Sequence, residues 1–284
     1  MAKKYIVIGG RGYVGSAIYS KIPGHLIGLR TSSTNASDFI QVRLGSPEDF
    51  SSLPISRGDV IFLTAAISAP DICANEHDRA WAVNVIGSIN LIIYAIDRGA
   101  RVVFFSSDTV YGERDDDFDE SAICNPAGEY AVMKRELEQR FDGIPFFKAI
   151  RLSYVFSKDD KFTRYLGGCA ERSEDAELFH PFYRSIVHRD DVVAGALALA
   201  ERWDEFPEQI INFGGPQVLS RVDFAQALRD VHFDNLRFSV TEPNAEFFNN
   251  RPRVIAMNSP VFGRLLGRPT RTLFEAARIE FDAI

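Results

Sequence analysis

The chain has 284 residues, of which 46% are hydrophobic and 25% charged, a composition typical of one globular domain or one domain with an added lobe. Its net charge of −7 excludes the basic character expected of a protein that binds nucleic acid or a membrane surface. No uninterrupted apolar stretch reaches eighteen residues, so we expect no membrane span, and the first residues lead directly into a predicted strand, so we expect no signal peptide. Cys73, Cys124 and Cys169 are widely spaced, which predicts reduced thiols of a cytoplasmic protein.

The chain begins with a predicted strand, a glycine-rich turn and a helix. Residues 5–8 form a short β-branched run, and residues 9–15 read Gly-Gly-Arg-Gly-Tyr-Val-Gly. Glycines at these spacings permit a tight turn, a close approach to a pyrophosphate, and close packing of helix on sheet. A phosphate would rest on the N–H groups at the start of the helix. The motif therefore predicts a dinucleotide site, with these residues at the cofactor: Gly9, Arg11, Gly12, Tyr13 and Val14.

A second strand is predicted over residues 25–30, and its end bears on the choice of cofactor. An acidic residue there would bind the ribose 2′-hydroxyl of NAD, but the chain has Arg30, followed by Thr31 and Ser32. An arginine followed by hydroxyl groups suits a 2′-phosphate. The sequence therefore favours NADP(H), with NAD(H) as the alternative; the competing interpretation of Arg30 is a solvated surface charge.

Further strands are predicted over residues 39–44, 59–64 and 101–105. The second of these is continuously apolar, as expected for a strand buried on both faces. It is followed by Thr64, Ala65 and Ala66, whose small side chains allow the backbone to approach a ligand.

The chemistry is predicted to come from the end of the strand 101–105 and from a later helix. Tyr130 and Lys134 are four residues apart and therefore share one face of that helix. A neighbouring ammonium, and the nicotinamide cation of an oxidised cofactor, favour the phenolate and would lower the pKa of Tyr130, so that the tyrosine exchanges a proton with a carbinol oxygen. Lys134 would also hold the cofactor, and a serine at the strand end would orient the same oxygen. Ser106 and Ser107 are both candidates for that serine.

Taken in order, these motifs resemble the extended short-chain dehydrogenase/reductases, the NAD-dependent epimerase/dehydratase family. Additional matches are Val-Asn-x-x-Gly around Asn84 and the Asn-x-Gly-Gly that begins at Asn212. The resemblance implies an α/β fold, a Rossmann-type doubly wound parallel sheet of about seven strands with a small C-terminal α/β substrate lobe. Residues 1–155 would bind NAD(P), and residues 156–284 would form mainly the substrate lobe, with segments near 185–215 returning to complete the first domain.

The resemblance also assigns roles to individual residues. It implies Ser107 rather than Ser106 as the catalytic serine, a buried Asn84 beside the cofactor, and a buried, paired Arg151. It implies that Asp190 or Asp191 caps a helix. The residues implied to contact the substrate are Ser107, Asp108, Thr109, Tyr183, Arg184 and Arg251. For Arg251 the alternative is again a surface charge. The acidic run over residues 115–120 is most simply a solvated loop, and no metal site is expected.

The segment after the catalytic serine separates subfamilies. Residues 107–112 read Ser-Asp-Thr-Val-Tyr-Gly and lack the second carboxylate of sugar-nucleotide dehydratases. The pattern is similar to those of 4-epimerases and of dTDP-4-dehydrorhamnose reductases, the nearer of the two being the reductases. The resemblance thus implies an NADP(H)-dependent 4-keto reductase of a nucleotide-activated deoxysugar. The alternatives are an NAD-dependent 4-epimerase and a non-catalytic NADP-binding regulator. The family resemblance also implies a homodimer in which the helix after Thr64 and the Tyr130 helix form a four-helix bundle with their copies in the partner.

Overall fold

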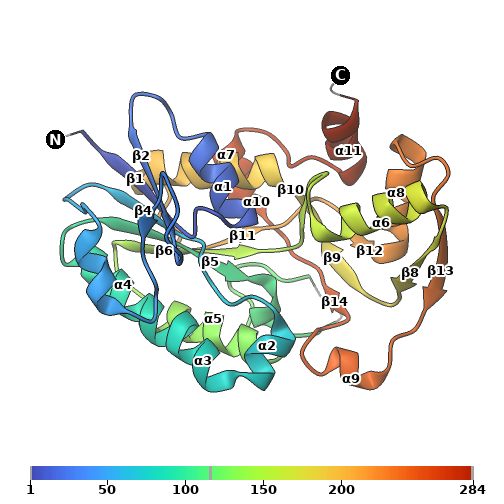
Figure 1. Ribbon diagram of the computed structural model, residues 1–284, viewed down its shortest axis with the longest axis horizontal. Helices are drawn as coiled ribbons and strands as arrows, with labels where there is room; N and C mark the ends of the chain where they lie inside the picture. Colours follow the sequence, from blue (N-terminus) through green and yellow to red (C-terminus); the bar gives the residue numbers. More distant parts are fainter. Residues whose placement is uncertain (1, 115–116, 283–284) are drawn as a thin grey trace.

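A parallel sheet of seven strands forms the centre of this computed structural model, which describes residues 2–114 and 117–282 (Figure 1). In sheet order β11-β6-β5-β4-β1-β2-β3, the chain builds outward from β1 to β3 and then from β4 to β6 on the other side. The sheet therefore switches direction between β1 and β4, the place where such folds bind ligands. The strands are β1 (Lys4–Ile8), β2 (Ile27–Ser32), β3 (Ile40–Gln41), β4 (Val60–Leu63), β5 (Arg101–Ser107), β6 (Phe147–Leu152) and β11 (Ile210–Phe213).

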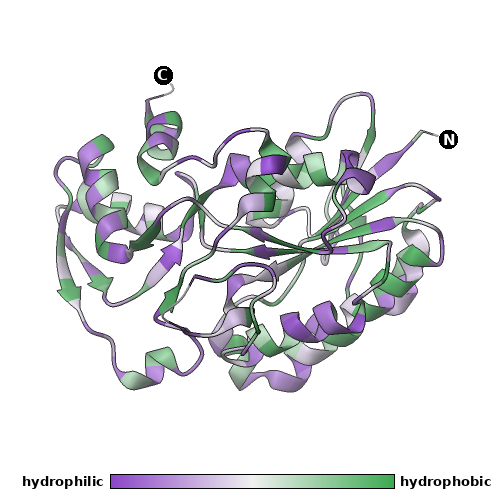
Figure 2. Cartoon of the chain, turned by 180° about the vertical axis from the view of Figure 1, so that it is seen from behind, coloured by the Kyte–Doolittle hydropathy of each residue, from purple (hydrophilic) through white to green (hydrophobic). Residues whose placement is uncertain are grey.

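Helices cover both faces of this sheet, as Figure 1 shows. Along β1, Ile6 and Ile8 pack into the core on one face, while Tyr5 and Val7 pack on the other. Both faces are apolar because both are buried, and the strands are mostly apolar in Figure 2. The predicted doubly wound α/β fold is confirmed. One face carries α2 (Pro70–Asn75), α3 (His77–Trp81), α4 (Ser88–Ile96) and α5 (Glu129–Arg140), and the other carries α1 (Tyr13–Ser20), α7 (Arg189–Glu201) and α10 (Pro260–Leu266).

The second half of the chain builds a smaller lobe with its own apolar cluster, in which Phe156, Leu178 and Phe224 are fully buried. The strand β11 leaves this region and pairs with β6 in the large sheet. The domain limit near residue 155 stays a prediction. The elements are β7 (Val155–Phe156), α6 (Lys161–Arg172), β8 (Asp175–Phe179), β9 (Tyr183–Ser185), β10 (Val187–His188), β12 (Val218–Ser220), α8 (Arg221–Val231), β13 (Arg237–Thr241), α9 (Ala245–Phe248), β14 (Val254–Ile255) and α11 (Leu273–Phe281).

The helix that was expected after Thr64 and carries Asn84 is a continuous helical stretch, His77–Ile96, whose middle, Ala82–Gly87, is wound as a π-helix. Judged by length and composition alone, it is also the one helix among the described residues that could cross a membrane. Its apolar side chains at Val85, Leu91 and Ile92 lie in the protein core. We therefore interpret the stretch as a helix of the protein core with one exposed face.

The expected helix cap at Asp190 or Asp191 was wrong, whereas the described part of the acidic run is mostly solvated, with Asp117 and Asp119 exposed. Helix α7 begins at Arg189 after His188, so Asp190 and Asp191 lie inside its first turn rather than capping it. Asp191 is fully buried and accepts hydrogen bonds from Arg268 and Arg271 of the C-terminal segment. In the acidic run, residues 115 and 116 lie outside the described residues, and Glu120 accepts a hydrogen bond from the backbone N–H of Asn212 at 3.1 Å.

Candidate active site

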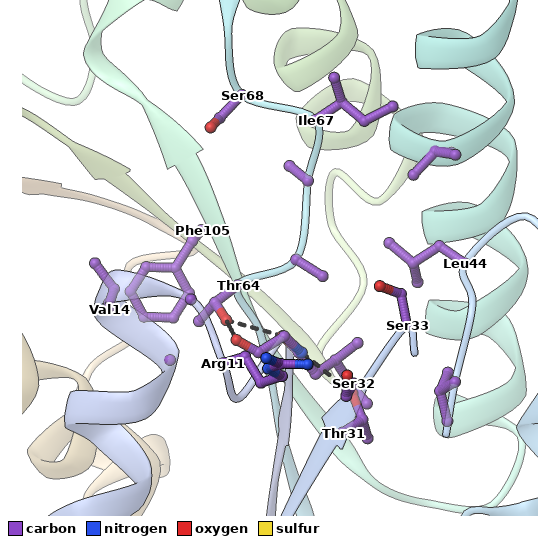
Figure 3. Close-up of a pocket in the computed structure, with 18 of the residues that line it drawn as sticks. Arg11, Val14, Thr31, Ser32, Ser33, Leu44, Thr64, Ile67, Ser68 and Phe105 are labelled. Atoms are coloured by element: carbon purple, nitrogen blue, oxygen red, sulfur yellow. Dashed lines mark hydrogen bonds between the residues drawn. The ribbon is translucent and has the colours of Figure 1, made fainter. Parts of the chain in front are cut away.

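A cavity of about 1000 Å³ lies at the carboxyl ends of β1, β4 and β5, where the sheet order switches. We call it the cofactor cavity. Figure 3 shows lining side chains from the glycine turn, the end of β2 and the turn after β4. Its volume is at the upper end of ligand pockets, ~300–1,000 Å³. Of the residues predicted to hold a cofactor, the lining includes Gly9, Arg11, Gly12, Tyr13, Val14, Thr31, Ser32, Thr64, Ala65, Ala66, Tyr130 and Lys134.

The glycine turn has the packing that its spacing predicted. Gly9 has a φ of 92°, and a Cβ atom there would lie 2.8 Å from the backbone nitrogen of Ala65. A Cβ atom on Gly15 would lie 2.6 Å from Thr64 Oγ1, which itself donates to the carbonyl of Ile8 at 2.8 Å. Gly12 caps α1 without a side-chain acceptor, so the first N–H groups of the helix are not capped by a side chain. This geometry suits a pyrophosphate.

Arg30 does not lie in the cofactor cavity. Strand β2 continues to Ser32, so Arg30 is inside the strand and faces away from the side on which Thr31 lies. Its guanidinium group packs between the rings of Tyr19 and Phe39, at 4.4 and 4.2 Å from their centroids. The placement of Arg30 at a 2′-phosphate is therefore corrected: the strand ends two residues later than the sequence predicted.

Arg11, from the glycine turn, is the arginine that the fold brings to the end of β2. Its Nη1 donates to Thr34 Oγ1 at 3.1 Å, and Thr34 Oγ1 lies 3.2 Å from Ser32 Oγ. Arg43 also lines the cavity, but its Nε and Nη2 are bound to Asp49 at 2.8 and 3.0 Å. Ser33, Thr34 and Arg43 were missed, although the hydroxyl run that begins at Thr31 signals the first two.

Asn84 shapes the cavity without lining it. It is 4% exposed, and its amide accepts from Ile67 N at 2.8 Å and donates to Ile67 O at 2.9 Å. These two bonds fix the turn after β4, whose Ile67 and Ser68 line the cavity. The buried, hydrogen-bonded role predicted for Asn84 is confirmed, and any effect on the cofactor passes through this turn.

Tyr130 and Lys134 meet the cavity from α5. Lys134 is 4% exposed, and its Nζ donates to the carbonyl of Phe105 at 2.7 Å. The same ammonium lies 5.5 Å from the ring centroid of Tyr130. The pair is therefore held as the i, i+4 spacing predicted, with the lysine fixed to β5.

Burial is the largest influence on the pKa values of Lys134 and Tyr130. It lowers the pKa of Lys134 from 10.5 to about 7, against the opposing charges of Cys73 and Glu138. It raises the pKa of Tyr130 well above its ordinary value, and the nearby Cys73 and Asp108 add to the shift. The expected lowering of the Tyr130 pKa was wrong for the protein without cofactor, because burial and the neighbouring Cys73 and Asp108 all raise it. Tyr130 is a neutral phenol, able to donate a proton.

Ser107 lies at the end of β5, against which α5 packs. It is 9% exposed, and its Oγ accepts from Thr109 N at 3.2 Å and lies 2.9 Å from Thr109 Oγ1. Ser106, rather than Ser107, borders the cofactor cavity, but its hydroxyl donates to Glu138 at 2.6 Å. That Ser107 rather than Ser106 is the catalytic serine stays a prediction.

Asp108 and Arg184 form a buried ion pair, with Nε and Oδ2 3.6 Å apart. Ser153 also donates to Asp108, at 3.0 Å, and Arg184 Nη2 donates to the carbonyl of Pro252 at 2.8 Å. Burial raises the pKa of Asp108 and lowers that of Arg184 to about 10. Arg184 is thus engaged with the protein itself, 7% exposed, rather than open to a substrate as expected.

A second hollow, of about 340 Å³, lies in the lobe, and we call it the aromatic pocket. Arg251 lines it, with Nη2 bound to Asp71 of α2 at 2.6 Å. Arg221 lies 4.0 Å from the ring centroid of Phe162. Tyr183 does not line it. Sequence reasoning missed these aromatic residues because they are far apart in the chain. The lining is Phe162, Tyr165, Glu177, Phe179, Phe182, Arg221, Phe247 and Arg251.

Curated relatives match most of the chain. Methionine adenosyltransferase 2 subunit beta of Xenopus laevis is 24% identical over 250 residues, 81% of this chain and 72% of the relative. The dTDP-4-dehydrorhamnose reductase of Mycolicibacterium smegmatis is 26% identical over 235 residues, 80% of this chain and 68% of the relative.

Solved structures share the fold over its whole length. A dTDP-4-dehydrorhamnose reductase from Bacillus anthracis, in complex with NADP, has a TM-score of 0.83 at 18% identity and covers 100% of both chains. A UDP-glucuronic acid 4-epimerase mutant from Bacillus cereus, with a UDP-sugar analogue and NAD, has a TM-score of 0.83 at 17% identity and covers 98% of each.

The model of the NAD dependent epimerase/dehydratase family matches residues 5–214, from the first strand of the sheet to the returning strand β11. That span includes the glycine turn, Ser107, Tyr130 and Lys134. The chain therefore belongs to this family, the extended short-chain dehydrogenase/reductase type of NAD(P)-dependent enzymes that its motifs predicted.

Proposed function

We propose that the protein is an NADPH-dependent reductase that converts the 4-keto group of a nucleotide-activated deoxysugar into a hydroxyl group. One observation carries the proposal: a neutral phenol, Tyr130, and a buried lysine line the same cavity as the glycine turn. A proton donor and a dinucleotide site thus share one space. The similarity to a reductase over 80% of the chain supports the same reaction class.

The residues would act on the oxygen of the carbonyl group. NADPH, when bound, supplies the hydride that forms a C–H bond at the carbonyl carbon. The electron pair of the C=O bond moves to the oxygen, which accepts the phenolic proton of Tyr130. Ser107 donates a hydrogen bond to the same oxygen, and Lys134 stabilises the phenolate that remains. Solvent protons then restore the phenol.

Arg11 supports NADPH over NADH. It lies at the end of β2 beside hydroxyl groups, where a dinucleotide in this fold presents its ribose 2′ position. A guanidinium group with hydroxyl groups beside it suits a phosphate there.

The test is the reduction of dTDP-4-dehydrorhamnose with NADPH, which is monitored through the loss of nicotinamide absorbance. We expect turnover with NADPH that exceeds turnover with NADH, and a loss of about 10²–10⁴-fold in Tyr130→Phe with cofactor binding retained. Turnover that Tyr130→Phe leaves unchanged would contradict the mechanism. No turnover with any 4-keto nucleotide sugar would contradict the proposal.

A 4-epimerase is the second candidate, since several solved relatives of the same fold are epimerases with NAD and a UDP-sugar. Such an enzyme would retain NAD through purification and interconvert UDP-glucose and UDP-galactose without net oxidation. NAD that copurifies and cannot be washed out, together with that interconversion, would favour the epimerase.

A regulatory subunit is the third candidate, favoured by the similarity to methionine adenosyltransferase 2 subunit beta over 81% of the chain. Tyr130→Phe separates the classes. A regulator would bind its partner and NADPH equally well with either residue, and it would show no turnover in the wild-type chain.

A further inference from the structure

Three side chains on α5 follow one another at intervals of four residues: Tyr130, Lys134 and Glu138. This spacing places them on one face of the helix, over three successive turns. The mechanism uses the first two, and nothing in it uses the third. Glu138 nevertheless has a side chain with no exposed area, which is rare for a carboxylate unless it is paired.

Both oxygens of Glu138 are fully engaged. Oε1 accepts from Ser106 Oγ at 2.6 Å and from Arg151 Nε at 3.1 Å. Oε2 accepts from Arg151 Nη2 at 2.8 Å and from Arg135 Nη1 at 2.9 Å. Arg151 is 2% exposed, as the sequence predicted, so a two-point arginine–carboxylate pair joins α5 to β6 inside the protein.

A buried ion pair of this kind is a weak source of net stability. The desolvation of two charges offsets most of their attraction, and apolar residues of similar volume often replace such a pair without loss of stability. What the pair supplies is a defined geometry, because a planar guanidinium group and a carboxylate meet in one orientation.

The contacts on β5 show what this geometry fixes. Lys134 Nζ binds the carbonyl of Phe105, and Glu138, one turn later, binds the hydroxyl of Ser106. The next residue of the strand is Ser107. Two successive turns of α5 therefore hold two successive residues of β5, immediately before the predicted catalytic serine.

We propose that Glu138 is a positioning residue, which fixes the Tyr130 and Lys134 side of α5 against Ser107 through its bonds to Ser106 and Arg151. The inference rests on the proposed function only for its effect on turnover. Displacing reacting groups by about 1 Å costs on the order of 10²-fold in rate.

The charge of Glu138 has a second consequence for Lys134. The groups that face this ammonium are Cys73 from α2, Tyr130 and Glu138 from its own helix, and the carbonyl of Phe105 from β5. Burial lowers the pKa of Lys134, and the negative charge of Glu138 opposes that shift. Without Glu138 the ammonium would lose its proton at a lower pH.

The test compares wild type with Glu138→Gln, with Ser106→Ala, and with Arg135→Met as the matched control. Arg135→Met removes the outer, 29% exposed partner of Glu138 and leaves the bonds to Ser106 and Arg151. The first readout is the titration midpoint of Lys134, measured by NMR on protein labelled with 13C at lysine Cε and assigned with Lys134→Met. The second is the split between kcat and KM with dTDP-4-dehydrorhamnose and NADPH.

In Glu138→Gln we expect the Lys134 midpoint to fall by at least about 0.5 pH unit and kcat to fall about 10–100-fold, with KM changed less than about threefold. Ser106→Ala should lower kcat about 3–10-fold, and Arg135→Met should match wild type in both. A folded Glu138→Gln whose Lys134 midpoint equals that of wild type overturns the proposal. If Glu138→Gln does not fold, unchanged kcat in Ser106→Ala overturns it.

The two proposals fail separately. If wild type does not reduce the keto sugar, the proposed function fails, and the NMR titration still decides the role of Glu138. If wild type reduces it and Glu138→Gln leaves both readouts unchanged, the positioning role fails alone.

Discussion

Lys134 shows how burial and function compete at a single residue. Its Nζ lies 4.5 Å from the ring centroid of Phe104 and 5.5 Å from that of Tyr130, and it donates to one backbone carbonyl. The cost of desolvating this ammonium appears as a lowering of the Lys134 pKa to about 7. A structural role would be better served by an apolar side chain, so the ammonium is expected to have a function.

This pKa leads to a prediction about stability. Below about pH 7 the folded and unfolded chains both carry the proton, and folding bears the full cost of burying the ammonium. Between about pH 7 and the ordinary lysine pKa of 10.5, only the unfolded chain binds this proton, so the free energy of unfolding of wild type rises with pH.

Lys134→Met removes this charge and keeps most of the stem. We expect the variant to have a higher Tm than wild type near pH 6, with the difference shrinking as the pH rises toward 10. Calorimetry of both proteins across that range is the measurement. A difference in Tm that stays constant with pH would contradict a lowered pKa for Lys134.

A second prediction separates the two arginines near the end of β2. Arg11→Ala should weaken NADPH binding about 10–100-fold and leave NADH binding within about threefold, because a charge-assisted phosphate contact contributes about 1.5–3 kcal/mol. Arg30→Ala is the matched control, expected to leave both affinities unchanged, since Arg30 packs between Tyr19 and Phe39. Fluorescence titration measures the affinities for NADPH and NADH. A loss of NADPH affinity in Arg30→Ala, and not in Arg11→Ala, would show that Arg30 binds the 2′-phosphate.

At the scale of elements, the turn between β1 and α1 determines how close the first helix lies to the sheet. Gly15, the last glycine of the motif, faces the carbonyl of Gly9 and the hydroxyl of Thr64, with no room for a side-chain carbon. The turn is therefore constrained by packing as well as by backbone conformation.

Gly15→Ala tests this packing. We expect the added methyl group to lower the free energy of unfolding by about 1–3 kcal/mol and to weaken NADPH binding, since the turn must shift. Gly24→Ala is the control, because a Cβ atom there meets no atom within 4 Å. Denaturant unfolding of both proteins gives the comparison; equal stability of the two variants would show that the turn has room to adjust.

At the scale of the whole molecule, two ion pairs connect the lobe to the sheet domain across the site. Arg251 of the lobe binds Asp71 at the start of α2, and Arg253 lies 3.7 Å from Glu113. Arg251 also lines the aromatic pocket, so a diphosphate bound there would compete with Asp71 for the same guanidinium group.

The homodimer is a prediction at this same scale. Ile86 and Ile93 are 50% and 43% exposed on the helical stretch His77–Ile96, and Val132 is 40% exposed on α5. These are the two helices expected to meet their copies in a four-helix bundle. We expect a dimer at micromolar concentration by sedimentation and a monomer for Ile86→Asp. Ile123→Asp, at the 80% exposed Ile123, is the control expected to stay a dimer; a monomeric wild type would contradict the bundle.

The accuracy of prediction depended on how local each feature is. The glycine turn, the buried strands and the Tyr130–Lys134 pair follow from residues within a few positions of one another, and the structure has each of them as predicted. The end of β2 was misplaced by two residues, which turned Arg30 away from the cavity. Asp191 was assigned to a helix cap because its real partners, Arg268 and Arg271, lie about eighty residues further along the chain.

The sequence by itself determined the fold class, the family, the dinucleotide turn and the spacing of Tyr130 and Lys134, because hydrophobic period and turn chemistry act over short stretches of chain. Only the tertiary structure decided that Arg11 reaches the cofactor cavity and Arg30 does not, that Arg184 pairs with Asp108, and that Glu138 binds Ser106 and Arg151. It also decided the protonation of Lys134 and Tyr130. These features depend on burial and on partners distant in the chain, and both arise only when the strands and helices are packed together.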